Sequence, residues 1–271
     1  MGPDEIREPA AAGQFYPGTK TKLERALSKL IDKKRRPQKA IGAMAPHAGY
    51  VYSGGVAGSV FSALKPKDLY ILIGPNHTGL GRPFGVFAEG KWKTPLGTVQ
   101  VDNGFAKRLM DKSKIFEPDE KSHKYEHSIE VLLPFLQYTA RDFKIAPLCI
   151  SGIDAGRLKK AAAEIAAAVK DTAADALIVA SSDMTHYEPQ EVAKEKDVQA
   201  ISAILKLDED ELLKRVVSMD ISMCGVAPAI ITLNASKALG AKKAELTDYK
   251  TSGDASGDYS AVVGYGGVII K

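Results

Sequence analysis

The chain has 271 residues, of which 45% are hydrophobic and 26% are charged. This composition is typical of a globular protein and excludes global disorder as a description of the chain. The formal net charge is only +4, from 37 basic and 33 acidic residues. A basic run at residues 33–36 lacks interleaved aromatic residues, so we interpret it as a solvated loop and expect no nucleic-acid partner.

The predicted elements alternate between helices and strands along the chain. Apolar spacing predicts helices over residues 23–31, 56–64, 103–110, 128–138 (interrupted by Pro134), 155–170, 190–205, 209–217 and 227–239. Strands are predicted at 40–45, 69–73, 143–150, 176–180, 244–251 and 260–270, and segments 84–88 and 97–101 flank Trp92 as a hairpin-like excursion. This order predicts an α/β fold with a central mixed, largely parallel sheet that is flanked by helices on both faces.

The compartment and the domain organisation follow from what the sequence lacks. Its two cysteines, Cys149 and Cys224, are too few for a disulfide scaffold. The first nine residues contain no hydrophobic signal region, and no apolar run approaches the ~20 residues of a membrane span. We therefore expect a cytoplasmic protein with reduced thiols and no membrane partner. Without a linker or repeat, residues 1–271 are predicted to form a single domain.

Three of the five histidines occupy the same position relative to a predicted strand. His47, His77 and His186 each lie in a short polar loop that follows an apolar strand. Ligands of open α/β sheets bind outside the carboxyl ends of the strands, so these loops could converge. Imidazole is a common metal ligand. One such histidine alone is more often a surface or hydrogen-bonded residue, whereas three together predict a metal-type site.

Other polar residues near these loops have two interpretations each. Asp183 could bind metal or orient the imidazole of His186, or it could cap a turn. His127 is a candidate site residue at a helix start, and Glu130 either faces the same way or is an ordinary solvent-facing charge. His123 lies in a polar run, and we expect it to be solvated.

The two cysteines differ in their surroundings. Cys149 lies in an apolar strand and is expected to be buried as a small hydrophobic residue. Cys224 directly precedes the predicted helix at 227–239. A helix N-terminus lowers the pKa of a thiol and favours the thiolate that binds metal or reacts, while simple burial is the alternative. The sequence contains no P-loop, GxSxG, HExxH or Rossmann motif.

Five ordered motifs resemble those of the Memo-like family, whose prokaryotic members are also called AmmeMemoRadiSam system protein B. They are residues 46–54, 74–77, 126–130, 181–187 and 223–225, and residues 7–17 resemble the N-terminal signature of the same family. The resemblance extends from residue 7 to the C-terminus. This family is similar to class III extradiol dioxygenases of the LigB type, which hold non-haem Fe(II) with two histidines and a carboxylate. The resemblance therefore implies the class III extradiol dioxygenase-like fold.

The resemblance also implies a set of site residues. The metal ligands would be His47, His77 and Cys224, and the residues lining the pocket would be His127, Asp183 and His186. A thiolate in place of the carboxylate departs from the dioxygenase pattern. Because thiolate is a softer ligand, the site suits copper or zinc as well as Fe(II).

These observations lead to three functional hypotheses. The first is a metal-dependent oxidoreductase using iron or copper, with His186 as the proton-transfer group, oriented by Asp183, and His127 binding an oxygen-bearing substrate. The second is a non-catalytic peptide- or protein-binding module that uses the vestigial dioxygenase pocket, with aromatic contacts from Tyr50, Tyr52 and Tyr187. The third is zinc-dependent hydrolysis, since three protein ligands and a water also describe catalytic zinc.

Overall fold

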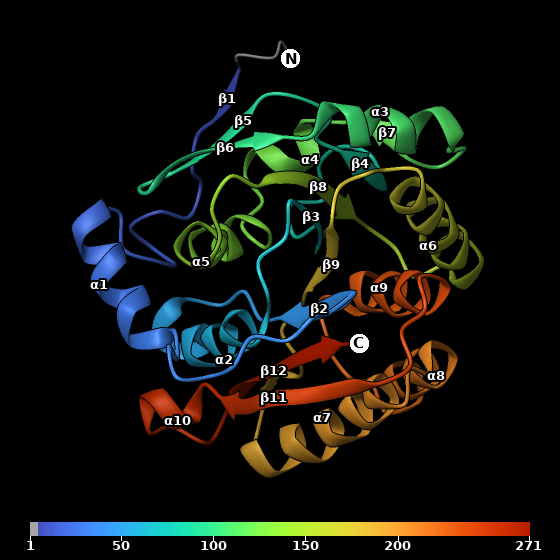
Figure 1. Cartoon of the computed structure of the whole chain (residues 1–271). Helices are drawn as coiled ribbons and strands as arrows, with labels where there is room; N and C mark the ends of the chain where they lie inside the picture. Colours follow the sequence, from blue (N-terminus) through green and yellow to red (C-terminus); the bar gives the residue numbers. More distant parts are fainter. Residues whose placement is uncertain (1–4) are drawn as a thin grey trace.

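The computed structural model describes residues 5–271, so part of the N-terminal segment in which we expected no signal region lies outside the described residues. Its centre is one large sheet (Figure 1). From one edge, the strand order is β1 (Ile6–Arg7), β5 (Lys91–Thr94), β6 (Gly97–Val101), β8 (Lys144–Ile150), β3 (Leu69–Pro75), β9 (Ala176–Ser181), β2 (Gly42–Ala45), β12 (Val262–Ile270) and β10 (His186–Glu188). β11 (Ala244–Thr251) pairs with β12, and β4 (Phe84–Val86) joins β8 to β7 (Glu117–Pro118).

The sheet is mixed, as predicted. Its five central strands, β6, β8, β3, β9 and β2, run parallel to one another. Antiparallel pairs are added around this core, where β12 joins β2, β10 and β11, β5 joins β6, and β4 joins β8. The predicted hairpin was partly wrong: β6 pairs with β5, which contains Trp92, while β4 pairs with β7 and β8.

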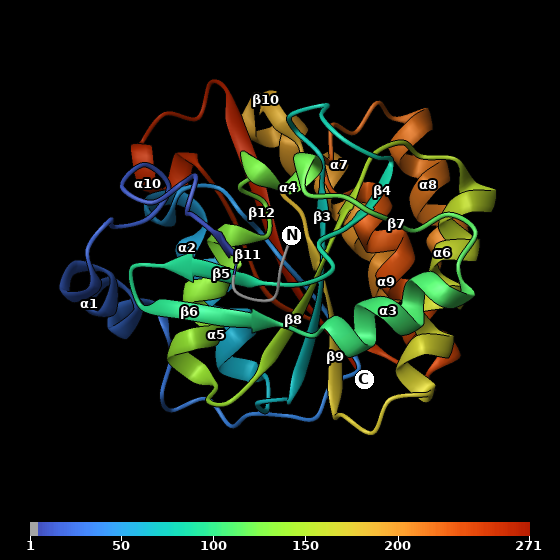
Figure 2. The same ribbon diagram turned by 90° about the horizontal axis from the view of Figure 1, so that it is seen from above.

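Helices cover both faces of the sheet, also as predicted (Figure 2). One face carries α1 (Lys20–Leu30), α2 (Tyr50–Ala63) and α5 (Leu133–Thr139). The other carries α3 (Asn103–Lys112), α6 (Ala155–Lys170), α7 (Gln190–Leu205), α8 (Glu209–Ser218) and α9 (Val226–Ala238). Short helical turns are α4 (Lys121–Lys124), η1 (Glu130–Leu132) and α10 (Gly253–Ser256). Across residues 5–271, no helix has both the length and the apolar character that crossing a bilayer requires.

The central strands are apolar along their whole length because both of their faces are covered. In β3, Leu69, Ile71 and Ile73 pack into the core under α3, α6 and α9, whereas Tyr70 and Leu72 pack under α1, α2 and α5. Successive side chains of a strand point to opposite faces, so a strand buried on both sides is a continuous apolar run.

Two helices differ most from the sequence prediction. α2 begins at Tyr50, six residues earlier than predicted, and includes Gly54 and Gly58. A Cβ at Gly54 would lie 2.9 Å from Leu30 Cδ1, and one at Gly58 would lie 2.2 Å from the carbonyl oxygen of Leu30, so these glycines are where α1 and α2 make close contact. Tertiary packing therefore outweighs the low helix propensity of glycine. The helix predicted at 128–138 is divided into η1 and α5, with Pro134 in the first turn of α5, where proline is tolerated.

Candidate metal centre

Three loops meet at the carboxyl edge of the central strands. His47, His77 and Asp183 each stand two residues beyond the ends of β2, β3 and β9, respectively. These strands are neighbours and run parallel, in the order β3–β9–β2. Because the carboxyl ends of parallel strands lie at one edge, the three loops converge as we expected from the sequence.

The three residues implied as metal ligands lie together. One side-chain donor atom from each of His47, His77 and Cys224 falls within 4.8 Å of the other two. The rings of His47 and His77 are 5.2 Å apart between centroids, and Cys224 Sγ is 3.5 Å from His47 Nε2. His47 is buried, whereas His77 lies on the open side of the cluster. Two imidazoles and one thiol are thus positioned around a common point.

Hydrogen bonds determine which nitrogen of His47 faces the cluster. Ser181 Oγ donates to the carbonyl oxygen of Ser128 at 2.6 Å, so it accepts a hydrogen bond from His47 Nδ1 at 2.8 Å. Nδ1 therefore carries the proton, and Nε2 presents its lone pair toward Cys224. Burial, and next the neighbouring His77, lower the pKa of His47 well below its ordinary value. The ring is therefore neutral, which is the form that binds metal.

Glu126 determines in the same way which nitrogen of His77 faces the cluster. His77 Nδ1 lies 2.9 Å from Glu126 Oε1, and the His77 backbone N–H donates to Oε2 at 2.6 Å. An ionised carboxylate only accepts, so Nδ1 carries the proton and Nε2 is left for another partner. A carboxylate that accepts from the far nitrogen of an imidazole is a common arrangement behind metal-binding histidines.

The ionisation of this pair strengthens the hydrogen bond between Glu126 and His77. Burial raises the pKa of Glu126, but hydrogen bonds from His77 and from backbone N–H groups outweigh it and hold that pKa at about 2. Burial lowers the pKa of His77, yet the hydrogen bond and charge of Glu126 raise it above its ordinary value. Glu126 was not among our predicted site residues. The one signal for it was its place in the motif at residues 126–130.

His127 and Phe15 form one wall of the site. The His127 ring stacks on His77 at 4.8 Å between centroids, and Phe15 covers it at 4.4 Å. Burial lowers the pKa of His127. His77, Glu126 and His127 also lie close enough to hold an ion. However, the Glu126 carboxylate already accepts four hydrogen bonds, so we assign it an orienting role. Phe15 was missed because it is separated from the other site residues by more than thirty positions.

Asp183 and His186 interact through their charges, but the hydrogen bond by which Asp183 could have oriented His186 is not formed. Asp183 Oδ1 instead accepts the backbone N–H of His47 at 2.8 Å, and burial raises the pKa of its carboxyl group. His186 Nδ1 donates to the carbonyl oxygen of Ser222 at 2.9 Å, and its backbone N–H donates to Ser222 Oγ at 2.7 Å. Ser222, rather than Asp183, therefore orients His186 and leaves Nε2 open to the cavity.

The structure distinguishes between the two interpretations of Cys224. It stands before Gly225, the N-cap residue of α9, as predicted. Burial of the thiol, and then the charge of Asp183, raise its pKa, which agrees with the interpretation of burial and not with a pKa lowered by the helix N-terminus. Desolvation and a neighbouring carboxylate both penalise the thiolate, and together they outweigh the helix dipole.

Two neighbouring polar residues are buried, contrary to our predictions. His123 is not solvated: it packs against Phe87 and Trp92, and its Nε2 is 3.2 Å from the carbonyl oxygen of Gly85. Burial lowers the pKa of His123 to about 4. Glu130 faces neither the solvent nor the cavity, and it forms a buried ion pair with Arg7. The polar run did not reveal this burial because it depends on Gly85 of β4, Phe87 and Trp92, which are distant in the sequence and pack on the His123 side of α4.

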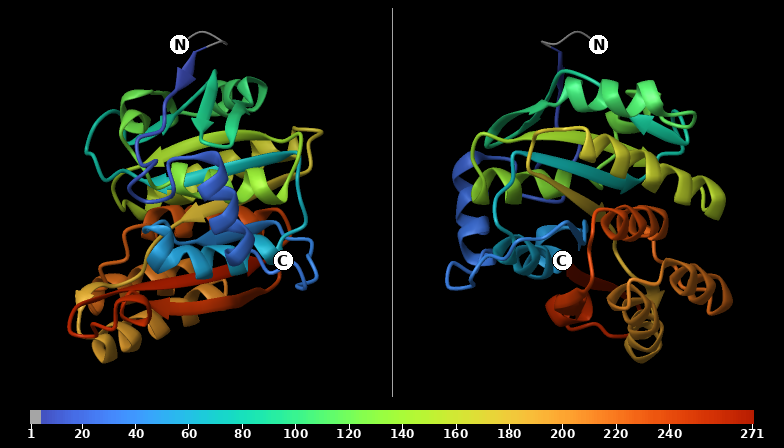
Figure 3. Two further views of the ribbon diagram at one scale, coloured as in Figure 1. Left: turned by 90° about the vertical axis from the view of Figure 1, so that its left-hand side faces the viewer. Right: turned by 45° about the vertical axis from the view of Figure 1, so that its right-hand side comes forward.

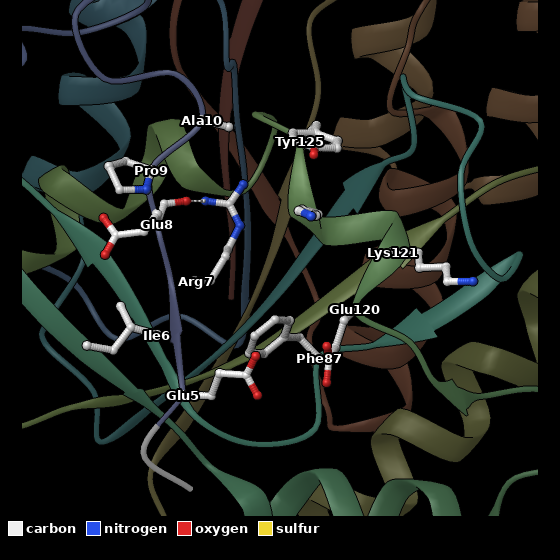
Figure 4. Close-up of a pocket in the computed structure, with 11 residues that line it drawn as sticks. Glu5, Ile6, Arg7, Glu8, Pro9, Ala10, Phe87, Glu120, Lys121 and Tyr125 are labelled. Atoms are coloured by element: carbon white, nitrogen blue, oxygen red, sulfur yellow. Dashed lines mark hydrogen bonds between the residues drawn. The ribbon is translucent and has the colours of Figure 1, made fainter. Parts of the chain in front are cut away.

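Arg7 and Glu130 attach residues 5–19, which we call the N-terminal strap, to the loop that carries Glu126 and His127. Arg7 Nε donates to the carbonyl oxygen of His123 at 2.9 Å, and another guanidinium nitrogen donates to that of Glu126 at 2.6 Å. Arg7 ends β1, and with residues of α4 it lines a cavity of about 520 Å³ (Figure 4). The strap in turn carries Phe15 to His127.

The candidate metal centre lies in an open cavity of about 460 Å³. It is lined by Phe15, His47, His77, His127, Asp183, His186, Tyr187, Ser222 and Cys224, among others. Of the three tyrosines predicted at its mouth, Tyr187 is exposed there, Tyr52 is exposed but outside the lining, and Tyr50 is buried, with its hydroxyl donating to the carbonyl of Val131. The cavity can therefore admit a small molecule, with one tyrosine at its edge.

Known proteins resemble this chain over almost its whole length. The family described as Memo-like protein matches residues 7–269. A MEMO1 family protein of Methanosarcina acetivorans is 46% identical over 98% of this chain and 100% of its own length. A MEMO1 family protein of Aquifex aeolicus is 43% identical, covering 97% and 98%. A crystal structure of an uncharacterized protein from Escherichia coli K12 aligns with a TM-score of 0.61 and 15% identity, over 85% of this chain and all of its own, and shows a similar fold.

Proposed function

This chain belongs to the Memo-like protein family, and we propose that it is a metal-dependent oxidoreductase that uses iron or copper, held by His47, His77 and Cys224. One observation carries the proposal. Both histidines donate their Nδ1 proton away from the cluster, to Ser181 and to Glu126, so both Nε2 lone pairs remain for a metal ion. Two separate networks with the same outcome favour a metal site over histidines that merely complete a polar core.

The donor set fits iron or copper. Two imidazoles with a thiolate provide a softer site than two imidazoles with a carboxylate, and thiolate favours copper while still suiting iron. The Cys224 thiol is protonated in the metal-free protein, because its pKa is raised. Binding would therefore release its proton, as is usual when metals bind cysteine. A bound ion would supply one-electron redox chemistry and an open coordination position at the cavity.

The chain's own residues provide proton transfer and substrate positioning. His186 donates from Nδ1 to Ser222, so its Nε2 is available to accept a proton from a substrate hydroxyl in the cavity. Asp183 holds the His47 backbone and thereby the position of one ligand. His127, fixed between His77 and Phe15, can bind an oxygen atom of the substrate. A cavity of about 460 Å³ limits the substrate to a small molecule.

Metal content is the direct test. Protein purified without an affinity tag under anaerobic conditions would be incubated with Fe(II) or Cu(I), desalted and analysed for bound metal. We expect about one ion per chain, lost in His47→Ala, His77→Ala and Cys224→Ala. The matched control is Cys149→Ala, which removes the other cysteine at a buried position in β8 and should leave the metal content unchanged.

The proposed oxidoreductase activity requires a separate measurement. Oxygen uptake by the metal-loaded protein would be followed with a panel of small phenols and diols, with His186→Gln as the variant that keeps the ligands. We expect uptake that depends on metal and falls in this variant. If the wild-type protein binds no metal after incubation, the metal site is refuted. If it binds metal but takes up no oxygen with any compound of the panel, the oxidoreductase activity is refuted.

A further inference from the structure

A groove runs between α1, the N-terminal strap and the first turn of α2. Its volume is about 720 Å³, and we call it the α1 groove. α1 lies on the outside of the molecule, in front of the sheet in the left view of Figure 3. Phe15 lines both the α1 groove and the cavity of the candidate metal centre, so the two sites share one wall.

The surface of the α1 groove is partly apolar. Ala26 and Leu30 of α1 contribute side chains, and both are only partly buried. Val51, in the first turn of α2, is 80% exposed. Phe15 completes this surface from the strap. An exposed apolar surface inside a groove is a binding site for an apolar side chain of a partner.

Three cations line the same groove without any counter-charge. Lys22, Arg25 and Lys29 follow one another at spacings of three and four residues, so they lie on one face of α1 and extend over ~10 Å of its axis. Within residues 5–271, none of the three side chains forms an ion pair, and the residues lining the groove include no aspartate or glutamate.

The net positive charge of the chain is concentrated in and directly after α1. Residues 20–39 contain nine basic and two acidic side chains, whereas the remaining 251 residues contain 28 basic and 31 acidic ones. The basic run at 33–36 directly follows α1, and most of its side chains are exposed, as expected from the sequence. It therefore extends the positive surface beyond the end of the α1 groove.

We propose that the α1 groove binds an acidic segment of a partner protein, with an apolar side chain of that segment seated on Leu30 and Val51. Carboxylates of the segment would face Lys22, Arg25 and Lys29. Complementary charge of this kind steers association and selects the partner. A single small anion would satisfy only one part of a cation row of this length.

The lining favours a peptide over a nucleic acid. Single-stranded nucleic acids bind where exposed aromatic rings alternate with cations, because each base needs a ring to stack on. Two of the three aromatic residues of the α1 groove, Tyr16 and Tyr50, are buried, and Phe15 is half-buried and packed on His127. Aliphatic side chains and cations remain, and these match an acidic segment that carries one or two leucines.

Fluorescence anisotropy tests the proposal. The probe is a labelled peptide of about twelve residues that is rich in glutamate and contains two leucines, a length suited to one groove. Binding should be measurable at low salt and weaker at high salt. The variant Lys22→Ala/Arg25→Ala/Lys29→Ala should weaken it about tenfold, because three exposed charge pairs are lost together. Val51→Asp should weaken it as well, and because Val51 is exposed this change leaves the fold intact.

A matched control separates the groove from overall charge. It removes the same number of cations from exposed positions away from α1, at Lys107, Lys114 and Lys206. The control should bind the peptide as the wild type does. Equal loss in both triple variants, unchanged binding in the α1 variant, or tighter binding of a single-stranded RNA of similar length would each overturn the proposal. Metal content should be the same in all of these proteins, so this result is independent of the proposed metal site.

Discussion

Replacement of Glu130 by glutamine should release the N-terminal strap. The Glu130 carboxylate is fully buried, and it accepts hydrogen bonds from Arg7, from the hydroxyl of Tyr16 at 2.6 Å, and from the backbone N–H groups of Ala10 and Ala11 at 2.7 and 2.8 Å. All four donors belong to the strap. Glu130 is therefore the main attachment of residues 7–16 to the rest of the molecule.

The size of the expected stability loss follows from the hydrogen-bond acceptors that glutamine lacks. Each carboxylate oxygen of Glu130 accepts two of the four bonds. The amide has one oxygen and one NH₂ group, so in either orientation two donors face another donor, at a cost of ~1–3 kcal/mol for each unsatisfied buried group. The guanidinium of Arg7 also loses its only ion-pair partner within the described residues. We expect a loss of about 3–5 kcal/mol in the free energy of unfolding, as is typical when one member of a buried pair is removed.

Urea unfolding of the wild type and Glu130→Gln would measure this difference. The control is Glu211→Gln, which breaks the partly exposed pair with Arg215 in α8 and should change the stability far less. Limited proteolysis adds a local readout, because a released strap should be cleaved before the folded core. The reasoning would be refuted by a stability change in Glu130→Gln no larger than that in Glu211→Gln, together with an uncut strap.

Three further predictions concern the site and its surroundings. Glu126→Gln should keep the fold but weaken metal binding ~10–100-fold, measured by competition with a chelator, because the amide no longer fixes the ring of His77 as a carboxylate does; unchanged affinity would contradict its orienting role. His123 has a pKa of about 4 in the folded chain, so the unfolded chain takes up its proton first as the pH falls below about 6.5. Relative to His123→Gln, the wild type should therefore lose up to ~3 kcal/mol of stability between pH 6.5 and 4, and parallel pH profiles in urea unfolding would disprove this. In Gly225→Ala, the new Cβ would lie 2.3 Å from a β9 carbonyl oxygen, so it should displace Cys224, lower the metal content and cost ~1–3 kcal/mol in thermal or urea unfolding.

The residues of the candidate centre differ in how visible they are in the sequence. His47 and His77 follow apolar strands directly, and the parallel arrangement of those strands then brings the two imidazoles together. Glu126 and Ser181 are ordinary polar residues in the sequence. They acquire their roles only because the loop after α4 and the end of β9 place them behind His77 and His47.

The amino-acid sequence by itself determined the class of the fold and the convergence of the histidines. Runs such as residues 69–73 are apolar at every position, which requires a strand covered on both faces, and that in turn requires helices on each side. The tertiary structure decided the burial of charged and polar groups. Glu130, His123 and the start of α2 depend on contacts with residues far away in the chain, such as Arg7, Gly85 and Leu30. Local pattern contains no information about such contacts, because the free energy of a buried polar group is set by partners that only the folded chain brings within hydrogen-bonding distance.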